Sequence, residues 1–201
     1  MHQGGSIMDQ QSPADAARDL VRRVAAGRRQ LLARAVGLHR STNLHICDAT
    51  AGLGRDAALM AALGARVDCF ERHADVHAWL ERFLTALPGD TRARIRLRHG
   101  DARELLGSGQ WDVVYLDPMY TPSGKAALPR AHAQSLRAAV GSDHDADALL
   151  APARAAARRR VVVKRAPRAP PLAGNSPMER MRGNSVRFDL YPPATAHDRI
   201  A

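Results

Sequence analysis

The chain contains 201 residues, of which 45% are hydrophobic and 25% are charged, and its formal net charge is +10. This composition is ordinary for a soluble globular domain that is long enough to bury a proper core. It excludes a transmembrane helix, because no stretch approaches the roughly 20 apolar residues that a membrane span needs. The polar first residues also lack the apolar core of a signal peptide. We therefore expect a cytoplasmic protein.

The excess of positive charge favours a polyanionic partner such as nucleic acid. The chain has 30 lysines and arginines against 20 aspartates and glutamates. An alternative explanation is a GC-rich genome, which raises the arginine content without any functional cause. The charge alone leaves both explanations open.

Cys47 and Cys69 are the only cysteines, and both fall in short apolar runs that predict buried strands. We expect no disulfide between them and no metal site, because their spacing matches no metal-binding pattern. The nine histidines likewise show no paired spacing for a metal ion.

The N-terminal part of the chain predicts a mobile tail over 1–15 and a helical region over 16–43. From Pro13 to Val36, apolar residues recur at helical spacing and arginines occupy the opposite positions. The pattern predicts either one helix interrupted near Gly27 or two helices. A basic amphipathic face of this kind can contact RNA or simply face solvent.

The rest of the chain alternates between apolar runs and helical patterns. Strands are expected at 44–48, 66–70, 94–98, 113–116 and 160–164, and helices at 54–63, 74–87, 131–140 and 145–157. This alternation predicts an α/β fold with a doubly wound, mostly parallel sheet. A proline-rich loop over 166–177 follows, and residues 178–182 and 185–191 are expected to form a final antiparallel pair.

The stretch around the first strand carries the first functional motif. The strand ends in Asp48 and is followed by Gly52, Gly54 and a helix. Strand, glycine turn and helix form the unit that binds a nucleotide-like ligand at the carboxyl end of a parallel sheet. The second strand ends in Glu71, 17 residues after Gly54, where a ribose hydroxyl partner belongs. The pattern fits both NAD and S-adenosylmethionine, and a tight turn without a ligand is the remaining alternative.

The fourth strand ends in a second motif, Asp117-Pro118-Met119-Tyr120. An exocyclic base amine is a poor nucleophile because its lone pair is delocalised into the ring. The Asp117 carboxylate and the Pro118 carbonyl can hold its two N–H protons and aim the lone pair at a methyl donor, while Tyr120 stacks on the base. The motif therefore predicts methylation of an amine, although Asp-Pro is also a common turn.

With both motifs placed, the sequence resembles the RsmJ family, bacterial methyltransferases that modify the exocyclic amine (guanine-N2) of a guanosine in small-subunit (16S) ribosomal RNA. The matching runs are 48–56 (DATAGLGRD), 114–120 (VYLDPMY) and 161–165 (VVVKR), with support from 145–150, 169–173 and 187–191. The likeness covers about 28–191. Family members usually have a longer N-terminal region, so the chain resembles a divergent member with a shortened N-terminus. After Met119 they usually continue Phe-Pro-His and then lysine-rich residues, whereas this chain continues Tyr-Thr-Pro-Ser-Gly-Lys.

The resemblance implies a class I (Rossmann-like) methyltransferase domain over 44–191, a tail over 192–201 and S-adenosylmethionine as cofactor. It places the cofactor against Arg55, Asp56, Glu71, Arg72, Asp101, Ala102 and Asp117, in addition to the motif residues Asp48, Gly52 and Gly54. The residues themselves suggest that Glu71 holds the ribose hydroxyls, that Arg72 flanks the adenine and that Asp101 accepts the adenine amine. Asp101 can also be the N-cap of a short helix, and Asp56 can simply favour a helix dipole.

Basic residues in the loops at the carboxyl edge of the sheet are expected to hold the RNA backbone near the site. These are Lys125, Arg130, Lys164, Arg165 and Arg168. Solvated surface charge is the alternative for each of them. The expected partner is ribosomal RNA or the small ribosomal subunit.

Three other functions compete with methylation of a guanosine in ribosomal RNA. The first is methylation of a different base amine. The second is an NAD-dependent oxidoreductase, which would need a second half to place the nicotinamide and would leave Asp117-Pro118 without a purpose. The third is a non-catalytic RNA-binding module that retains the fold.

Overall fold

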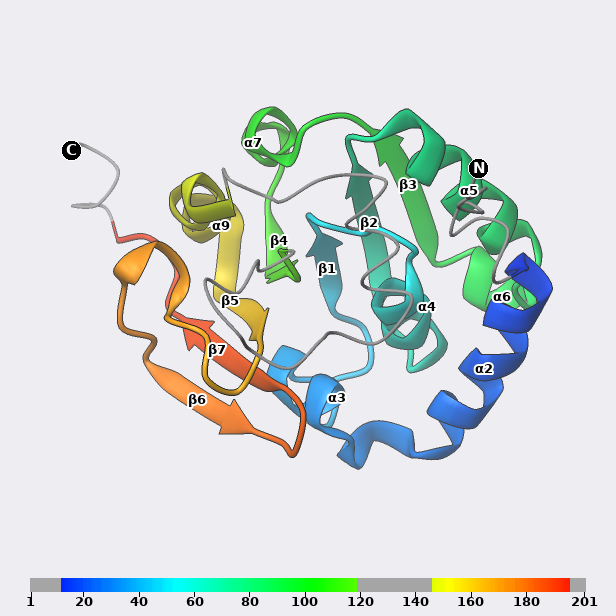
Figure 1. The fold of residues 1–201 in the computed structure, drawn as a ribbon, viewed down its shortest axis with the longest axis horizontal. Helices are drawn as coiled ribbons and strands as arrows, with labels where there is room; N and C mark the ends of the chain where they lie inside the picture. Colours follow the sequence, from blue (N-terminus) through cyan, green and yellow to red (C-terminus); the bar gives the residue numbers. More distant parts are fainter. Residues whose placement is uncertain (1–11, 119–145, 196–201) are drawn as a thin grey trace, which may run out of the picture.

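The computed structural model describes residues 12–118 and 146–195 and contains a seven-stranded sheet in the order β3-β2-β1-β4-β5-β7-β6. Five parallel strands are followed by β7, which pairs antiparallel with β5 on one side and β6 on the other. Figure 1 shows β3 and β6 at the two ends of the sheet. The strands are β1 (His45–Asp48), β2 (Arg66–Glu71), β3 (Ile95–His99), β4 (Trp111–Leu116), β5 (Ala157–Arg165), β6 (Glu179–Arg182) and β7 (Arg187–Tyr191). The predicted α/β architecture with antiparallel C-terminal strands is confirmed.

Helices cover both faces of the sheet. One core lies between the sheet and α2, α3, α4 and α5, and a second lies between the opposite face and α7, α9 and the short turns beside them. The helices are α2 (Pro13–Ala25), α3 (Leu31–Val36), α4 (Arg55–Ala62), α5 (Ala74–Thr85), α6 (Gly89–Arg92), α7 (Ala102–Leu105) and α9 (Leu150–Ala156). Single 3-10 turns are η1 (Gly27–Arg29), η2 (Leu106–Ser108), η3 (Ala146–Leu149) and η4 (Leu172–Gly174).

Strand alternation sends neighbouring residues of one strand into different cores. In β4, Val113 and Tyr115 face the helices α2 to α5, whereas Val114 and Leu116 face α7 and α9. Cys47 and Cys69 are both buried free thiols, and they lie in opposite cores. The apolar run Val113–Leu116 in β4 is explained by this burial on both faces.

Some boundaries differ from the sequence prediction. The N-terminal region forms two helices that η1 separates at Gly27, where φ is +63°. Helix α2 begins at Pro13, and the Ser12 side chain caps it by accepting from the Asp15 N–H. Strand β5 begins at Ala157, three residues earlier than predicted, because pairing with β4 overrides the charged sequence there. The helix expected at 131–140 lies outside the described residues.

No helix in the described ranges is long and apolar enough to span a membrane. Within the same ranges, no group of three or more histidine, cysteine, aspartate or glutamate side chains is placed to hold a metal ion.

Candidate active site

The turn between β1 and α4 requires glycine for two separate reasons. Gly52 and Gly54 have φ values of +51° and +66°, in the left-handed region that side chains disfavour. A Cβ atom on Gly54 would also lie 2.2 Å from Cδ1 of Leu80 on α5. The sequence Gly-Leu-Gly therefore permits both the turn and the close packing of α4 against α5.

Glu71 ends β2 and fixes this turn from the neighbouring strand. Its Oε2 accepts the Gly52 N–H at 3.0 Å and its Oε1 accepts the His73 N–H at 2.8 Å. The side chain is buried. Because each carboxylate oxygen has two lone pairs, Glu71 can hold the turn and still accept from a ligand hydroxyl.

Asp101 follows β3 and is the N-cap of α7, as one of the two sequence interpretations expected. Its carboxylate accepts the Arg103 N–H at 2.8 Å and pairs with the Arg103 guanidinium at 2.6 Å. Arg72, at the end of β2, lies 4.0 Å from the same carboxylate. Ala102 is buried beneath them. Arg72 and Asp101 therefore meet at the carboxyl edge, and their contact with the adenine stays a prediction.

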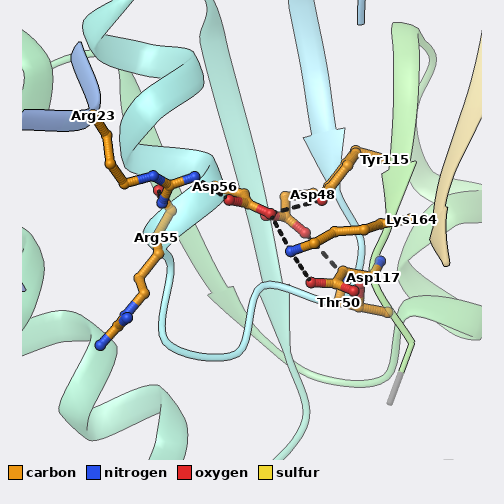
Figure 2. Close-up of polar contacts among 8 residues, drawn as sticks. All are labelled: Arg23, Asp48, Thr50, Arg55, Asp56, Tyr115, Asp117 and Lys164. Carbon is orange, nitrogen blue, oxygen red and sulfur yellow. Dashed lines mark hydrogen bonds and ion pairs between the residues drawn. The ribbon is translucent and has the colours of Figure 1, made fainter. Parts of the chain in front are cut away.

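A cluster of charged side chains joins α4, β4 and β5 at the same edge (Figure 2). The Lys164 Nζ atom lies 2.7 Å from Oδ2 of Asp117 and 2.8 Å from Oδ2 of Asp56. It therefore bridges the acid after β4 to the acid that opens α4. The Asp117 side chain is 40% exposed, so a substrate can reach it.

Two further side chains complete the coordination of Asp56. The Tyr115 hydroxyl donates to its Oδ2 at 2.7 Å, and the Arg23 guanidinium contacts its Oδ1 at 2.6 Å. Arg23 comes from α2 and also donates to the Arg55 carbonyl at 2.9 Å. The buried carboxylate of Asp56 thus connects the N-terminal helix to the end of the sheet (Figure 2).

The ends of β1 and β4 are connected through Thr50. The Asp117 N–H donates to the Thr50 hydroxyl at 2.6 Å, and the Thr50 N–H donates to the Asp48 carboxylate at 3.3 Å. Asp48 is buried, and so is Pro118. The two sequence motifs are therefore one site, although Tyr120 lies outside the described residues.

Comparison with known proteins identifies the family to which the chain belongs. The family described as "putative SAM-dependent methyltransferase" matches residues 7–193. The ribosomal RNA small subunit methyltransferase J of Erwinia tasmaniensis is 42% identical over 96% of this chain and 79% of its own length. The protein of the same name from Rhodopseudomonas palustris is 44% identical over 86% of this chain and 89% of its own length. The chain belongs to the ribosomal RNA small subunit methyltransferase J family.

A solved SAM-dependent methyltransferase has a fold similar to that of this chain. The crystal structure of a SAM-dependent methyltransferase from Neisseria gonorrhoeae is 37% identical, with a TM-score of 0.67 over 86% of this chain and 74% of that one. S-adenosylmethionine is therefore the cofactor, which excludes the NAD-dependent alternative. The residues present fit it: Gly52 and Gly54 form the tight turn after the first strand, and Glu71 stands at the end of the second strand.

Burial and ion pairing have opposite effects on the pKa values of Asp56 and Lys164 in the charged cluster. Burial alone would raise the pKa of Asp56, but Lys164 and Arg23 reverse this and lower that pKa well below its usual range. Burial alone would lower the pKa of Lys164, but Asp117 and Asp56 raise it. The ions of the cluster are thus held in their charged forms at neutral pH.

The pKa shifts of two other groups in the cluster favour the neutral form instead of the charged form. Burial, reinforced by the negative charge of Asp56, raises the pKa of Asp48 well above its usual value. Burial and the same carboxylate also raise the pKa of Tyr115, which keeps its hydroxyl protonated as a donor.

The five residues expected on the RNA backbone do not share one environment. Lys164 lies inside the charged cluster, and Arg165 is buried with its guanidinium donating to the Pro170 carbonyl at 2.8 and 3.1 Å. Arg168 is exposed. Lys125 and Arg130 lie outside the described residues. Strand β5 continues to Arg165, so Lys164 and Arg165 belong to the sheet, and of the three described residues only Arg168 lies in the loop.

Sequence reasoning missed Arg23 and Tyr115 as parts of the site. Arg23 is one of several arginines on α2, and nothing local distinguishes it from its neighbours. Tyr115 carried a usable signal, because a tyrosine in an apolar strand that is buried on both faces needs a partner for its hydroxyl.

Proposed function

We propose that this protein transfers a methyl group from S-adenosylmethionine to the exocyclic amine of a guanosine in small-subunit ribosomal RNA. The observation that carries the proposal is the position of Asp117-Pro118 at the carboxyl end of β4, beside the glycine turn and within reach of solvent. The substrate class follows the printed names of relatives that are 42–44% identical.

The cofactor is proposed to lie across the ends of the first three strands. Gly52 and Gly54 give the backbone room to approach it, and Glu71 accepts from its ribose hydroxyls. Arg72 and Asp101 flank the adenine side, as their proximity supports. When bound, S-adenosylmethionine supplies an electrophilic methyl group on a positively charged sulfur.

The target amine is proposed to meet Asp117 and the Pro118 carbonyl. Each accepts one N–H, so the nitrogen lone pair is directed at the methyl group. As the N–C bond forms, the C–S bond breaks, and the proton that leaves the nitrogen passes to water by way of the Asp117 carboxylate. Most of the rate gain comes from positioning. Tyr120 remains a prediction as the stacking partner of the base.

Lys164 has a different role in this proposal from the RNA contact that its sequence suggested. Its ammonium group is held by two carboxylates at 2.7 and 2.8 Å, one of which is Asp117. A bridging ammonium fixes the rotation of the Asp117 carboxylate, so that one acceptor site faces the amine. Lys164 is therefore proposed as a positioning residue.

The test is methyl transfer from radiolabelled S-adenosylmethionine to naked small-subunit ribosomal RNA and to small subunits isolated from cells that lack the enzyme. We expect labelled N2-methylguanosine after nucleoside digestion. Asp117→Ala should reduce turnover by at least about 10²-fold, as the loss of one preorganised hydrogen-bond partner does, while S-adenosylhomocysteine still binds. A different labelled nucleoside would indicate another base amine, and labelling of neither substrate would contradict the proposal.

A further inference from the structure

The outer edge of the sheet carries a second basic feature, remote from the charged cluster. Four arginines, Arg66, Arg92, Arg94 and Arg96, line one hollow of about 540 Å³ beside β3. We call this set the arginine hollow. The acids Asp68 and Glu81 also line it, so arginines outnumber acids four to two.

The positive charge of the hollow is only partly offset by acids in the described part of the chain. Arg66 and Arg96 are exposed, and neither makes a hydrogen bond or ion pair with a described side chain. Arg92 and Arg94 donate only to backbone carbonyls, those of Ile95 and Gly64. Neutral carbonyls leave the guanidinium charge in place.

One of the two acids in the hollow, Asp68, already interacts with other side chains. Asp68 stands directly opposite Arg96 in the register of β2 and β3. Its Oδ2 nevertheless accepts from the Trp111 indole at 2.8 Å and lies 3.1 Å from Nε2 of His45. Oδ2 of Asp68 is thus engaged by Trp111 and His45, and Arg96 keeps its donors for another partner.

One structural role could explain arginines at this place without any ligand. Strand β3 is outermost in the sheet, and charged side chains on an edge strand prevent pairing with another chain. Protection of the edge strand works with positive or negative side chains. Binding of an anion needs positive charge, so the two explanations make different predictions for charge reversal.

The geometry points to a phosphodiester backbone as the occupant: we propose that the arginine hollow binds a second part of the RNA substrate. Guanidinium groups match phosphate oxygens with paired donors, and the hollow gathers four of them. The inference rests on the proposed function, because it takes the substrate to be RNA.

The hollow is too far from Asp117 for one nucleotide to reach both. Arg96 and Asp117 are separated by three strand spacings across the sheet and three residues along it. This corresponds to roughly 15–20 Å for ordinary strand geometry. The hollow therefore contacts a different nucleotide of the RNA from the one that meets Asp117, and it contributes to substrate binding and not to the chemical step.

The test compares two charge-reversal variants with the same change in net charge. The first is Arg66→Glu with Arg96→Glu. The control is Arg158→Glu with Arg182→Glu, which changes exposed arginines elsewhere on the sheet. The probe is a transcript of small-subunit ribosomal RNA, titrated over a range of salt concentrations and then used in methyl-transfer kinetics.

We expect the hollow variant to lose at least about tenfold in RNA affinity at low salt. The slope of log K against log salt should fall by about 1.5, since each phosphate contact contributes about 0.7–0.9. KM for RNA should rise while kcat and S-adenosylhomocysteine affinity stay unchanged, and the control variant should remain within about threefold of the wild type.

Equal losses in the two variants would show that net charge alone governs binding and would overturn the inference. Wild-type affinity in the hollow variant would also overturn it and leave edge protection as the explanation. Failure of the proposed function is distinct, because it shows as an absence of methyl transfer by the wild-type protein that still binds the transcript. A wild-type protein that binds no RNA overturns both.

Discussion

The carboxyl edge of the sheet and the arginine hollow use charge in opposite ways. At the carboxyl edge, Lys164 and Arg23 are paired with carboxylates at 2.6–2.8 Å, and the acid between them is buried. In the hollow, Arg66 and Arg96 are exposed and have no partner within the described ranges. Ion pairing fixes the positions of the side chains, but burying the charges costs desolvation free energy. An exposed and unpaired charge stays available for a partner, but it does not orient another side chain. The first arrangement suits chemistry, and the second suits docking.

The largest expected effect comes from removing the Asp56 carboxylate, which lies at the centre of the charged cluster. Asp56→Ala leaves Lys164, Arg23 and the Tyr115 hydroxyl without their shared acceptor. Loss of one partner from a buried ion pair costs about 3–5 kcal/mol of unfolding free energy, which urea denaturation can measure. The matched control is Asp19→Ala, which removes the exposed pair with Arg22 and should cost about 0.5 kcal/mol or less. Similar costs for both variants would contradict the distinction between the two kinds of pair.

A second experiment separates the positioning role of Lys164 from the RNA contact that its sequence suggested. Lys164→Met should lower kcat by about 10–100-fold, because Asp117 loses the ammonium that orients it, with S-adenosylhomocysteine affinity unchanged. Lys164→Arg should restore part of the rate. A raised KM for RNA with normal kcat would instead identify Lys164 as a backbone contact.

The smallest expected effect is a change of the unfolding free energy with pH, which comes from Lys164 in the charged cluster. The folded-state pKa of Lys164 is raised by Asp117 and Asp56 against the effect of burial, so its stabilisation is fully present below its unfolded pKa of about 10.4. Above that pH, the stability advantage of the wild type over Lys164→Met should narrow by up to about 1.4 kcal/mol per pH unit. Denaturation of both proteins at pH 7 and pH 11 checks this. A constant difference would show that Lys164 does not titrate with folding.

The lowered pKa of Asp56 acts at the other end of the pH range. Its contribution is present above its unfolded value of about 3.9 and is lost as the pH falls toward the lower folded value. The contributions of Asp56 and Lys164 are therefore both present between about pH 4 and pH 10.

The sequence predicted the sheet and the turn around it because these depend on local patterns. Apolar runs marked β1, β2 and β4, and the glycine spacing marked the turn that Glu71 supports. The role of Arg23 was not predictable, because its partner lies 33 residues away on another helix and the pairing arises only when α2 packs on α4. Lys164 was expected to contact the RNA backbone because it ends a strand at the carboxyl edge, whereas its pairing with Asp56 spans 108 residues. Long-range charge pairing leaves no periodic trace in a sequence.

The partners of Asp56 are made at very different times during translation. Arg23 precedes it by 33 residues, whereas Lys164 follows it by 108. At about 5–20 residues per second, the emerging chain therefore has about 5–20 s in which Arg23 is the only one of these two cations that can neutralise Asp56. The N-terminal helix can thus protect the buried acid while the first strands assemble. Asp117 acquires its orienting ammonium only when Lys164, 47 residues later, has been made, so the charged cluster is completed after strands β1 to β4.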